Sequence, residues 1–282
     1  MYLDFYGLNY MPFSISPDPK FLWLSPTHQE AISVLQYGLI EDKGFLVLTG
    51  EVGTGKTLLI KNLIRSSPVP AIIVAIPDPG MKPIEFFRCL ADEAGMAQTF
   101  NGKAEFFIQL KHFLLEAYGS KKKVLLIIDE SQRLNHKLLN QIRLLSNIEM
   151  KNRKLINIFF IGQNEFVNLL LDERNKATRQ RIAVKCNLIP FTEDETGNYI
   201  KHRLKIAGCT DEIFNREAIR EVHRYAQGYP RTINVLCDKA LLMGFRAGSK
   251  RIGPDIVIAC EEEVAPLSDP VSAVETETGI PQ

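Results

Sequence analysis

No stretch of this sequence is long and apolar enough to cross a lipid bilayer. Crossing takes about 20 consecutive apolar residues, whereas the longest apolar runs, residues 124–128 and 158–161, have the length of β-strands. A secretory signal is also missing, because Asp4 stands in the region that should be basic and prolines follow at positions 12, 17 and 19. We therefore expect a soluble protein with no transmembrane segment, located in the cytoplasm or held at the inner membrane by a partner.

The sequence also lacks paired cysteines and a surplus of charge. Its five cysteines are far apart and form no C-x-x-C pair, which argues against a zinc site and against a disulfide framework. Lys and Arg total 34 and Asp and Glu total 33, so the net charge is +1. This balance gives no general reason to expect a nucleic-acid partner, although short basic runs occur at residues 121–123 and 151–154.

Over the first 190 residues, apolar runs alternate with segments of helical spacing. The runs that predict strands are residues 45–49, 71–76, 124–128, 156–161 and 184–189. Continuous apolar strands that alternate with helices are typical of a parallel sheet covered by helices on both faces. Residues 1–25 are rich in proline and aromatic residues, and we expect them to form an ordered arm without regular secondary structure.

After Pro190 the pattern becomes that of helices alone. Thr192-Glu-Asp-Glu195 forms a capping box, Asn215 suits a helix N-cap, and Pro230 suits the first turn of a helix. We expect residues 1–190 to form the arm and an α/β domain, and residues 191–264 to form a small all-helical domain. Residues 265–282 are polar, contain prolines, and are expected to be a disordered tail.

One segment matches a phosphate-binding loop. Gly50-Glu51-Val52-Gly53-Thr54-Gly55-Lys56-Thr57 fits G-x-x-x-x-G-K-[ST] and lies between a predicted strand and a predicted helix. The glycines let backbone N–H groups surround phosphate oxygens, and the helix N-terminus adds its positive end. We expect Lys56 to reach the β- and γ-phosphates, Thr57 to ligate Mg²⁺, and Leu58 to border the nucleotide. This motif predicts a nucleoside triphosphatase that uses ATP and Mg²⁺.

Two carboxylates follow the apolar run at residues 124–128. Asp129 and Glu130 come directly after this predicted strand, at the end where ligands bind in parallel sheets. Asp129 is expected to hold Mg²⁺ through its water shell. Glu130 is expected to act as the general base for the attacking water.

Polar and basic residues mark three further positions. Gln163 or Asn164 follows the run at 156–161 and is expected to orient the water, with Gln163 preferred. Arg179 and Arg181 precede the last predicted strand, and either they reach a γ-phosphate or they belong to a solvated basic turn. Arg231, at the start of a helix in the all-helical domain, is expected to contact phosphate.

This combination resembles the AAA+ ATPases. The flanking residues resemble, more narrowly, the ExeA-type general-secretion-pathway ATPases, whose relatives occur in pilus-biogenesis and exosortase-associated loci. The matching segments are Phe5-Tyr-Gly-Leu-Asn-Tyr-Met-Pro-Phe13, Ser16-Pro-Asp-Pro19, Phe21-Leu-Trp-Leu-Ser-Pro26, Tyr37-Gly-Leu39, Thr49-Gly-Glu-Val-Gly-Thr-Gly-Lys-Thr57, Gly162-Gln163, Arg179-Gln-Arg-Ile182 and Gly228-Tyr-Pro-Arg-Thr-Ile-Asn-Val-Leu-Cys-Asp238. The resemblance covers about residues 1–262.

The resemblance implies an AAA+ sheet followed by a helical lid, with adenine bound near the N-terminal arm. It also implies that Gln163 is the sensor-1 residue, that Arg231 is the sensor-2 residue, and that Arg181 or Arg179 acts on a neighbouring subunit of a homo-oligomer. The sequence departs from the family at two places. Asn164 replaces the usual proline, and residues 173–178, which precede Arg179 and Arg181, differ from the usual family sequence.

The function expected from this resemblance is ATP hydrolysis that drives assembly or remodelling of an envelope secretion, pilus or exopolysaccharide machine, with a protein partner from that machine. The alternative is a DNA-binding ATPase related to transposition target-selection ATPases, supported by the basic runs at 121–123, 151–154 and 174–185. A slowly hydrolysing scaffold is a third hypothesis, and the presence of Glu130 argues against it.

Overall fold

The computed structural model describes residues 2–16, 18–67, 69–96, 99–150, 153–209 and 211–264. The chain divides into two compact units. The sheet unit comprises Pro17–Phe191 and Tyr229–Arg231, and the helical unit comprises residues up to Ser16, Thr192–Gly228, and the chain from Thr232 onward. Residues 265–282, for which we expected a disordered tail, lie outside the described residues.

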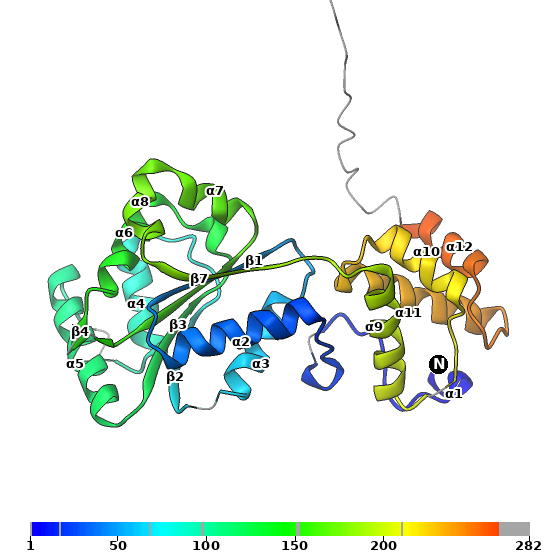
Figure 1. Ribbon diagram of the computed structural model, residues 1–282. Helices are drawn as coiled ribbons and strands as arrows, with labels where there is room; N and C mark the ends of the chain where they lie inside the picture. Colours follow the sequence, from blue (N-terminus) through cyan, green and yellow to red (C-terminus); the bar gives the residue numbers. More distant parts are fainter. Residues whose placement is uncertain are drawn as a thin grey trace, which may run out of the picture. The chain divides into compact units, whose positions relative to one another are not determined.

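Five parallel strands form the sheet, in the order β2-β3-β6-β1-β7 (Figure 1). Their bounds are β1 Phe45–Gly50, β2 Ala71–Ile76, β3 Lys123–Ile128, β6 Asn157–Gly162 and β7 Ile182–Leu188. Every strand that the apolar runs predicted is present, within two residues at each end. The predicted fold class, a parallel sheet flanked by helices and followed by a helical region, is therefore confirmed.

Helices cover both faces of the sheet, which explains why the strands are apolar on both sides. Phe45 and Val47 of β1 belong to one core cluster, and Leu46 and Leu48 belong to the other, because successive side chains of a strand point to opposite faces. The helices that join the first cluster are α4 Pro83–Glu93, α5 Lys103–Gly119, α6 His136–Leu145 and α7 Glu165–Leu171. Those that join the second are α2 Pro26–Ile40 and α3 Lys56–Arg65.

Several short elements of the sheet unit were not predicted. They are η1 Pro19–Phe21, η2 Ser131–Arg133, β4 Glu149–Met150, β5 Arg153–Lys154, α7 Glu165–Leu171, η3 Glu173–Asn175 and α8 Lys176–Arg179. Elements of two to seven residues show too few turns or alternations to produce a periodic pattern. The longer helices were predictable mainly from the periodic spacing of their apolar residues. In α2 the structure adds a cap, since the Ser25 hydroxyl accepts the N–H of His28.

The helical unit is built from α1 Leu3–Tyr6, α9 Glu193–Ile206, α10 Arg216–Ala226, α11 Pro230–Arg246 and α12 Pro254–Val264. The predicted capping box of Thr192 and Glu195 begins α9, and the side chain of Asn215 caps α10. The first residues of α11, up to Arg231, belong to the sheet unit. Within the described residues, no helix combines the length and apolar character that spanning a membrane requires.

The N-terminal arm differs from the expectation in two respects. It contains the short helix α1, and residues up to Ser16 group with the helical unit rather than with the sheet. The contacts explain this grouping, because the Tyr2 hydroxyl donates to Asp238 and the Tyr6 hydroxyl donates to the Ser249 carbonyl at 3.0 Å. The buried guanidinium of Arg203 donates to the Pro12 carbonyl.

Candidate functional site

The segment from Gly50 to Thr57 connects the carboxyl end of β1 to the start of α3. Its glycines are required by backbone conformation, since Gly50, Gly53 and Gly55 have φ values of 155°, 85° and 94°, which side-chain-bearing residues rarely adopt. A Cβ on Gly50 would also lie 2.8 Å from the Leu188 carbonyl oxygen. The loop thus has the left-handed turns that direct backbone N–H groups inward.

Lys56 lies in the first turn of α3 with its side chain folded over the loop. Its Nζ donates hydrogen bonds to the carbonyl oxygens of Gly50 at 2.8 Å and Glu51 at 2.9 Å. Burial lowers the pKa of Lys56, while the nearby carboxylates of Glu130 and Asp129 act in the opposite direction. The ammonium group is therefore held in place above the loop, opposite the two predicted carboxylates.

Asp129 lies at the carboxyl end of β3 and faces Thr57. Its backbone N–H donates to the Ile76 carbonyl, which fixes it at the edge of the sheet. The Thr57 hydroxyl donates to Oδ2 of Asp129 at 3.4 Å. Burial raises the pKa of Asp129, and its hydrogen bond from the Glu130 N–H opposes this shift. Two hard oxygen donors from different elements are thus brought together.

Glu130 has a left-handed backbone conformation, with φ of 48°. Such a conformation is unfavourable for a residue with a side chain, and it is often retained at functional sites. The Glu130 carboxylate accepts a hydrogen bond from the side-chain amide of Gln132. The carbonyl oxygen of the same amide accepts the backbone N–H of Gln163 at 3.1 Å. Gln132 therefore links Glu130 to the end of β6, a role that no motif indicated.

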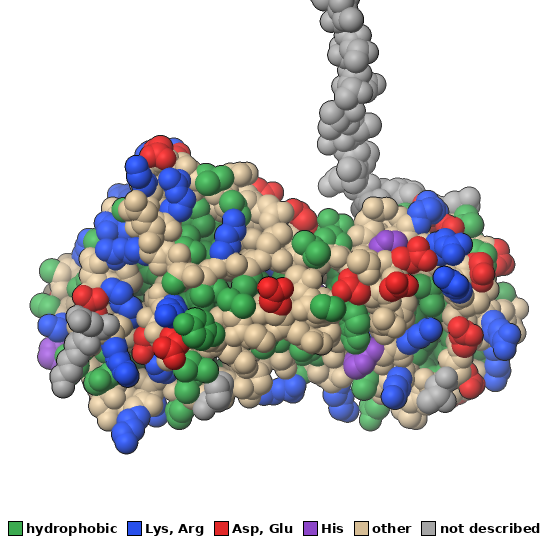
Figure 2. Space-filling view, in the orientation of Figure 1, with side chains coloured by type: hydrophobic (Ala, Val, Ile, Leu, Met, Phe, Trp, Pro, Cys, Tyr) green, Lys and Arg blue, Asp and Glu red, His purple; other side chains and the backbone are tan. Residues whose placement is uncertain are grey.

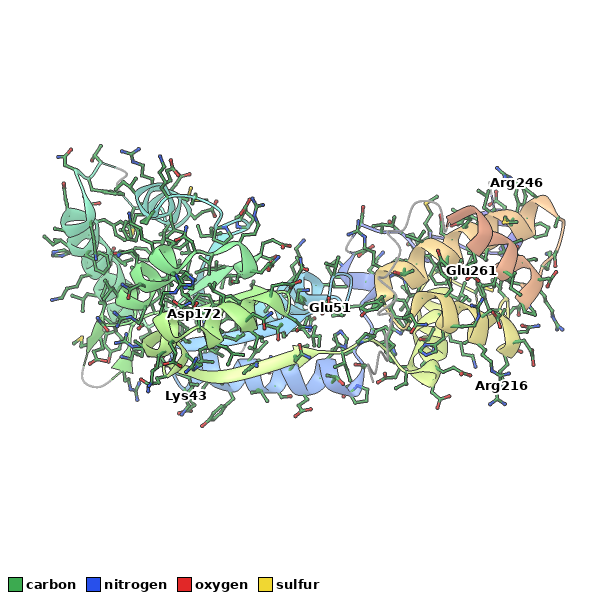
Figure 3. All side chains as sticks on the ribbon, turned by 90° about the horizontal axis from the view of Figure 1, so that it is seen from above. Lys43, Glu51, Asp172, Arg216, Arg246 and Glu261 are labelled. Carbon is green, nitrogen blue, oxygen red and sulfur yellow. The ribbon has the colours of Figure 1, made fainter. Side chains whose placement is uncertain are left out.

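The two candidate sensor residues follow β6 and have different surroundings. The Asn164 amide donates to the Glu51 carboxylate, within the phosphate-binding loop. Gln163 is held by its backbone to Gln132 and so lies next to the Glu130 network. Glu51 lies just beyond the end of β1, and Lys43 lies before its start (Figure 3). The choice of Gln163 over Asn164 stays a prediction.

Arg179 and Arg181 both bind backbone carbonyls at helix ends within their own chain. Arg179 donates to the carbonyls of Leu170 and Leu171, at the end of α7, and to the Glu173 carboxylate at 3.2 Å. Arg181 donates to acceptors at the end of α6, which are the Arg143 carbonyl at 3.0 Å, Ser146 Oγ at 2.7 Å and Asn147 Oδ1 at 2.7 Å. Figure 2 shows Lys and Arg side chains gathered around α6 and α8.

Arg231 lies against the phosphate-binding loop. Its backbone N–H donates to the Gly53 carbonyl at 3.4 Å. A Cβ on Gly53 would come within 3.0 Å of the Arg231 Cβ. The Arg231 side chain is exposed. The structure therefore brings this predicted residue next to the loop, although the role of its guanidinium stays a prediction.

His28 is a further residue of the site that the sequence did not single out. It is buried in α2, and its Nε2 lies 3.1 Å from the carbonyl oxygen of Thr54, inside the phosphate-binding loop. Its Nδ1 lies 2.7 Å from Ser25 Oγ, and its ring packs on Phe191 at 5.6 Å. Because a carbonyl oxygen can only accept, Nε2 of His28 donates the hydrogen bond to Thr54. His28 thus connects α2 to the phosphate-binding loop.

We expect His28→Leu to weaken binding of ADP by about tenfold, because it removes the donor to a buried carbonyl. His28→Gln retains an amide donor and should lose less affinity. The measurement is ADP affinity by calorimetry, with thermal unfolding without nucleotide as a check on folding. Equal losses in the two variants would contradict a role through the Thr54 hydrogen bond.

Comparison with known proteins agrees with this geometry. The profile of an AAA domain matches residues 40–170. General secretion pathway protein A of Aeromonas hydrophila is 36% identical over 270 residues, which are 95% of this chain and 49% of that protein. This chain thus spans about half the length of that relative.

Solved structures of low sequence identity share the fold. Cdc6p from Pyrobaculum aerophilum has a TM-score of 0.66 at 18% identity, over 90% of this chain and 70% of that one. Aeropyrum pernix ORC2, solved as ADPNP–ADP complexes, has a TM-score of 0.63 at 16% identity, over 90% and 73%. The Thermotoga maritima RuvB Holliday junction branch migration motor has a TM-score of 0.55 at 17% identity, over 84% and 68%. The matches confirm the resemblance predicted from the sequence: this chain contains an AAA domain and belongs with the ExeA-type general secretion pathway proteins.

Proposed function

We propose that this chain binds ATP with Mg²⁺ at residues 50–57 and hydrolyses it. The observation that carries the proposal is the convergence of Lys56, Thr57, Asp129 and Glu130 at the carboxyl ends of β1 and β3. The Thr57 hydroxyl lies 3.4 Å from the Asp129 carboxylate, and the carboxylates of Asp129 and Glu130 both act on the charge of Lys56. These side chains supply the cation, metal ligands and base that phosphoryl transfer requires.

The residues fit Mg²⁺ rather than a metal caged by protein. The Thr57 hydroxyl and the Asp129 carboxylate are hard oxygen donors, which Mg²⁺ prefers. The described residues contain no group of three or more His, Cys, Asp or Glu side chains placed to hold a metal. This is the arrangement expected where phosphate and water complete the coordination. When bound, Mg²⁺ supplies positive charge that offsets the charge of the phosphates.

Each side chain has a separate task in this proposal. Lys56 exchanges its hydrogen bonds to Gly50 and Glu51 for bonds to phosphate oxygens. Glu130 accepts the proton of the attacking water, and Gln132 holds the Glu130 carboxylate in place. Gln163 or Asn164 orients the water from the end of β6. Arg231, beside Gly53, contacts phosphate.

We also propose that hydrolysis requires assembly with other copies of this chain. Arg181 donates hydrogen bonds only to neutral acceptors. Glu149 acts on its charge, but the two form no ion pair within the described residues, whereas Arg179 pairs with Glu173. Of the two arginines, Arg181 therefore has the charge that remains available to a γ-phosphate on a neighbouring subunit. A homo-oligomer would place it there.

The cellular role follows from the relative rather than from the geometry. General secretion pathway protein A matches 95% of this chain. We propose that the chain acts as the ATPase of an envelope secretion or related export machine, bound to a protein partner of that machine. We propose residues 1–190 and 191–264 as its arm-plus-nucleotide domain and its lid domain, although the structure groups the arm with the lid helices.

Lys56→Ala tests the proposed binding site. Removal of the ammonium should weaken ATP binding by about 100-fold, since hydrogen bonds to charged groups contribute one to two decades of affinity. The matched control is Lys61→Ala, an exposed lysine on the same helix. Calorimetry with ATP and Mg²⁺ measures both. Equal affinity for ATP in wild type and Lys56→Ala would show that residues 50–57 do not bind the nucleotide.

A further inference from the structure

Two basic runs that are far apart in the sequence meet at one cavity of the sheet unit. Lys121–Lys123 lead from α5 into β3, and Arg153–Lys154 form β5. Together with Tyr118 and Leu155, they line a cavity of about 450 Å³. The proposed ATP site does not use any of these residues.

This cavity lies at the amino-terminal edge of the sheet. Lys123 begins β3, while Asp129, of the proposed ATP site, follows the end of the same strand. Asp42, which also lines the cavity, precedes β1, whereas Gly50 ends it. Lys43 and Glu51, at the two ends of β1, show the separation of the edges (Figure 3). A six-residue strand spans about 20 Å, so the cavity is separate from the ATP site.

The cavity has a surplus of positive charge. Lys123 is neutralised by Asp42 at 2.6 Å, and Lys154 by Glu149 at 2.6 Å. Lys121, Lys122 and Arg153 are exposed, and no ion pair involves them within the part of the chain that the structure describes. The C-terminal end of α5 favours nearby cations, which accounts for Lys121 and Lys122. It does not account for Arg153, which comes from a different part of the chain.

An aromatic ring and an aliphatic side chain complete the lining. Tyr118 is 39% exposed and Leu155 is 8% exposed. Cations combined with an exposed aromatic ring suit a ligand that has phosphates and a flat apolar part. The volume lies within the range of about 300–1,000 Å³ of small-ligand sites.

We propose that this cavity binds a small organic polyphosphate of nucleotide size. Its phosphates contact Lys121, Lys122 and Arg153, and its planar part lies against Tyr118. The site takes the ligand without Mg²⁺, because the cations come from the protein. Strand β3 connects this cavity to Asp129 of the proposed ATP site. Binding of the polyphosphate in the cavity can therefore be measured alongside nucleotide binding at the ATP site.

Equilibrium dialysis with radiolabelled ATP tests the proposal. Wild type should bind two nucleotides per chain, one requiring Mg²⁺ and a weaker one that is independent of Mg²⁺ and sensitive to salt. The double variant Lys122→Glu/Arg153→Glu should weaken the second class by about tenfold for each reversed cation and leave the first. Lys56→Ala should weaken the Mg²⁺-dependent class and leave the Mg²⁺-independent class unchanged. The ATP site and this cavity are therefore tested separately.

The matched control is Lys111→Glu/Lys137→Glu, which reverses two exposed lysines outside the cavity lining and should retain both classes. The neutral variant Lys122→Gln/Arg153→Gln should give an intermediate loss and guards against misfolding. Failure to find the second class, or an equal loss in the control, would overturn the proposal. Binding of a single-stranded oligonucleotide through Lys122 and Arg153, without binding of ATP, would also overturn the proposal. The site would then bind a nucleic-acid strand rather than a small ligand.

Discussion

Glu130→Gln is expected to keep ATP bound but to lower turnover by about 10²–10⁴-fold, the usual contribution of a general base. The glutamine side chain has nearly the same shape, so nucleotide contacts are retained. Its amide cannot accept the proton of the attacking water. Calorimetry measures the binding, and phosphate release at saturating ATP and Mg²⁺ measures the turnover.

The control for this variant is Glu165→Gln. Glu165 begins α7 and acts on the charge of Lys56, but it makes no hydrogen bond to Gln132 in the described contacts. Its removal changes the charge near Lys56 without removing the proposed base. We expect turnover close to that of wild type, because Glu165 is exposed and is not the proposed base. Unchanged turnover in Glu130→Gln would show that another group accepts the proton.

Arg181→Gln is expected to bind ATP normally and to hydrolyse it ~10³–10⁵-fold more slowly, as for loss of an arginine that neutralises the transferring phosphoryl group. Arg179→Gln should have a smaller effect, because Glu173 already compensates its charge. Phosphate release as a function of protein concentration is the measurement. In wild type, turnover per subunit should rise with concentration as copies assemble.

Arg181 also holds the end of α6, so a loss of activity by itself does not separate catalysis from structure. Mixing Arg181→Gln with Glu130→Gln protein makes this distinction. A mixed assembly pairs an intact Arg181 with an intact Glu130, so some activity should return. If the mixture stays inactive and wild-type turnover is independent of concentration, Arg181 has only the structural role seen at α6.

The sheet and the phosphate-binding loop were predictable because their patterns are local. Apolar runs such as residues 124–128 fixed the strands, and the spacing of Gly50, Gly55 and Lys56 fixed the loop. Thr192 and Asn215 gave the starts of two helices through their caps. In each case the residues that carry the pattern are adjacent in the sequence, so no knowledge of tertiary contacts was needed.

The parts that were missed depend on contacts between distant residues. His28 contacts Thr54, 26 positions away, and Gln132 joins Glu130 to Gln163, 31 positions away. The contacts of the arm with Asp238 and Ser249 could not be predicted, because they join residues more than 200 positions apart in the sequence. The roles proposed for Gln163, Arg179, Arg181 and Arg231 stay predictions, because they concern contacts with water, with phosphate or with a neighbouring subunit.

The most direct test of the account is multiple-turnover phosphate release from ATP by the assembled chain, with and without Mg²⁺, beside Lys56→Ala and Glu130→Gln. The account predicts Mg²⁺-dependent release by wild type. Lys56→Ala should need about 100-fold more ATP for the same rate, and Glu130→Gln should release phosphate about 10²–10⁴-fold more slowly although ATP is held. Release by Lys56→Ala at the wild-type rate would contradict it, since hydrolysis would then occur at another site.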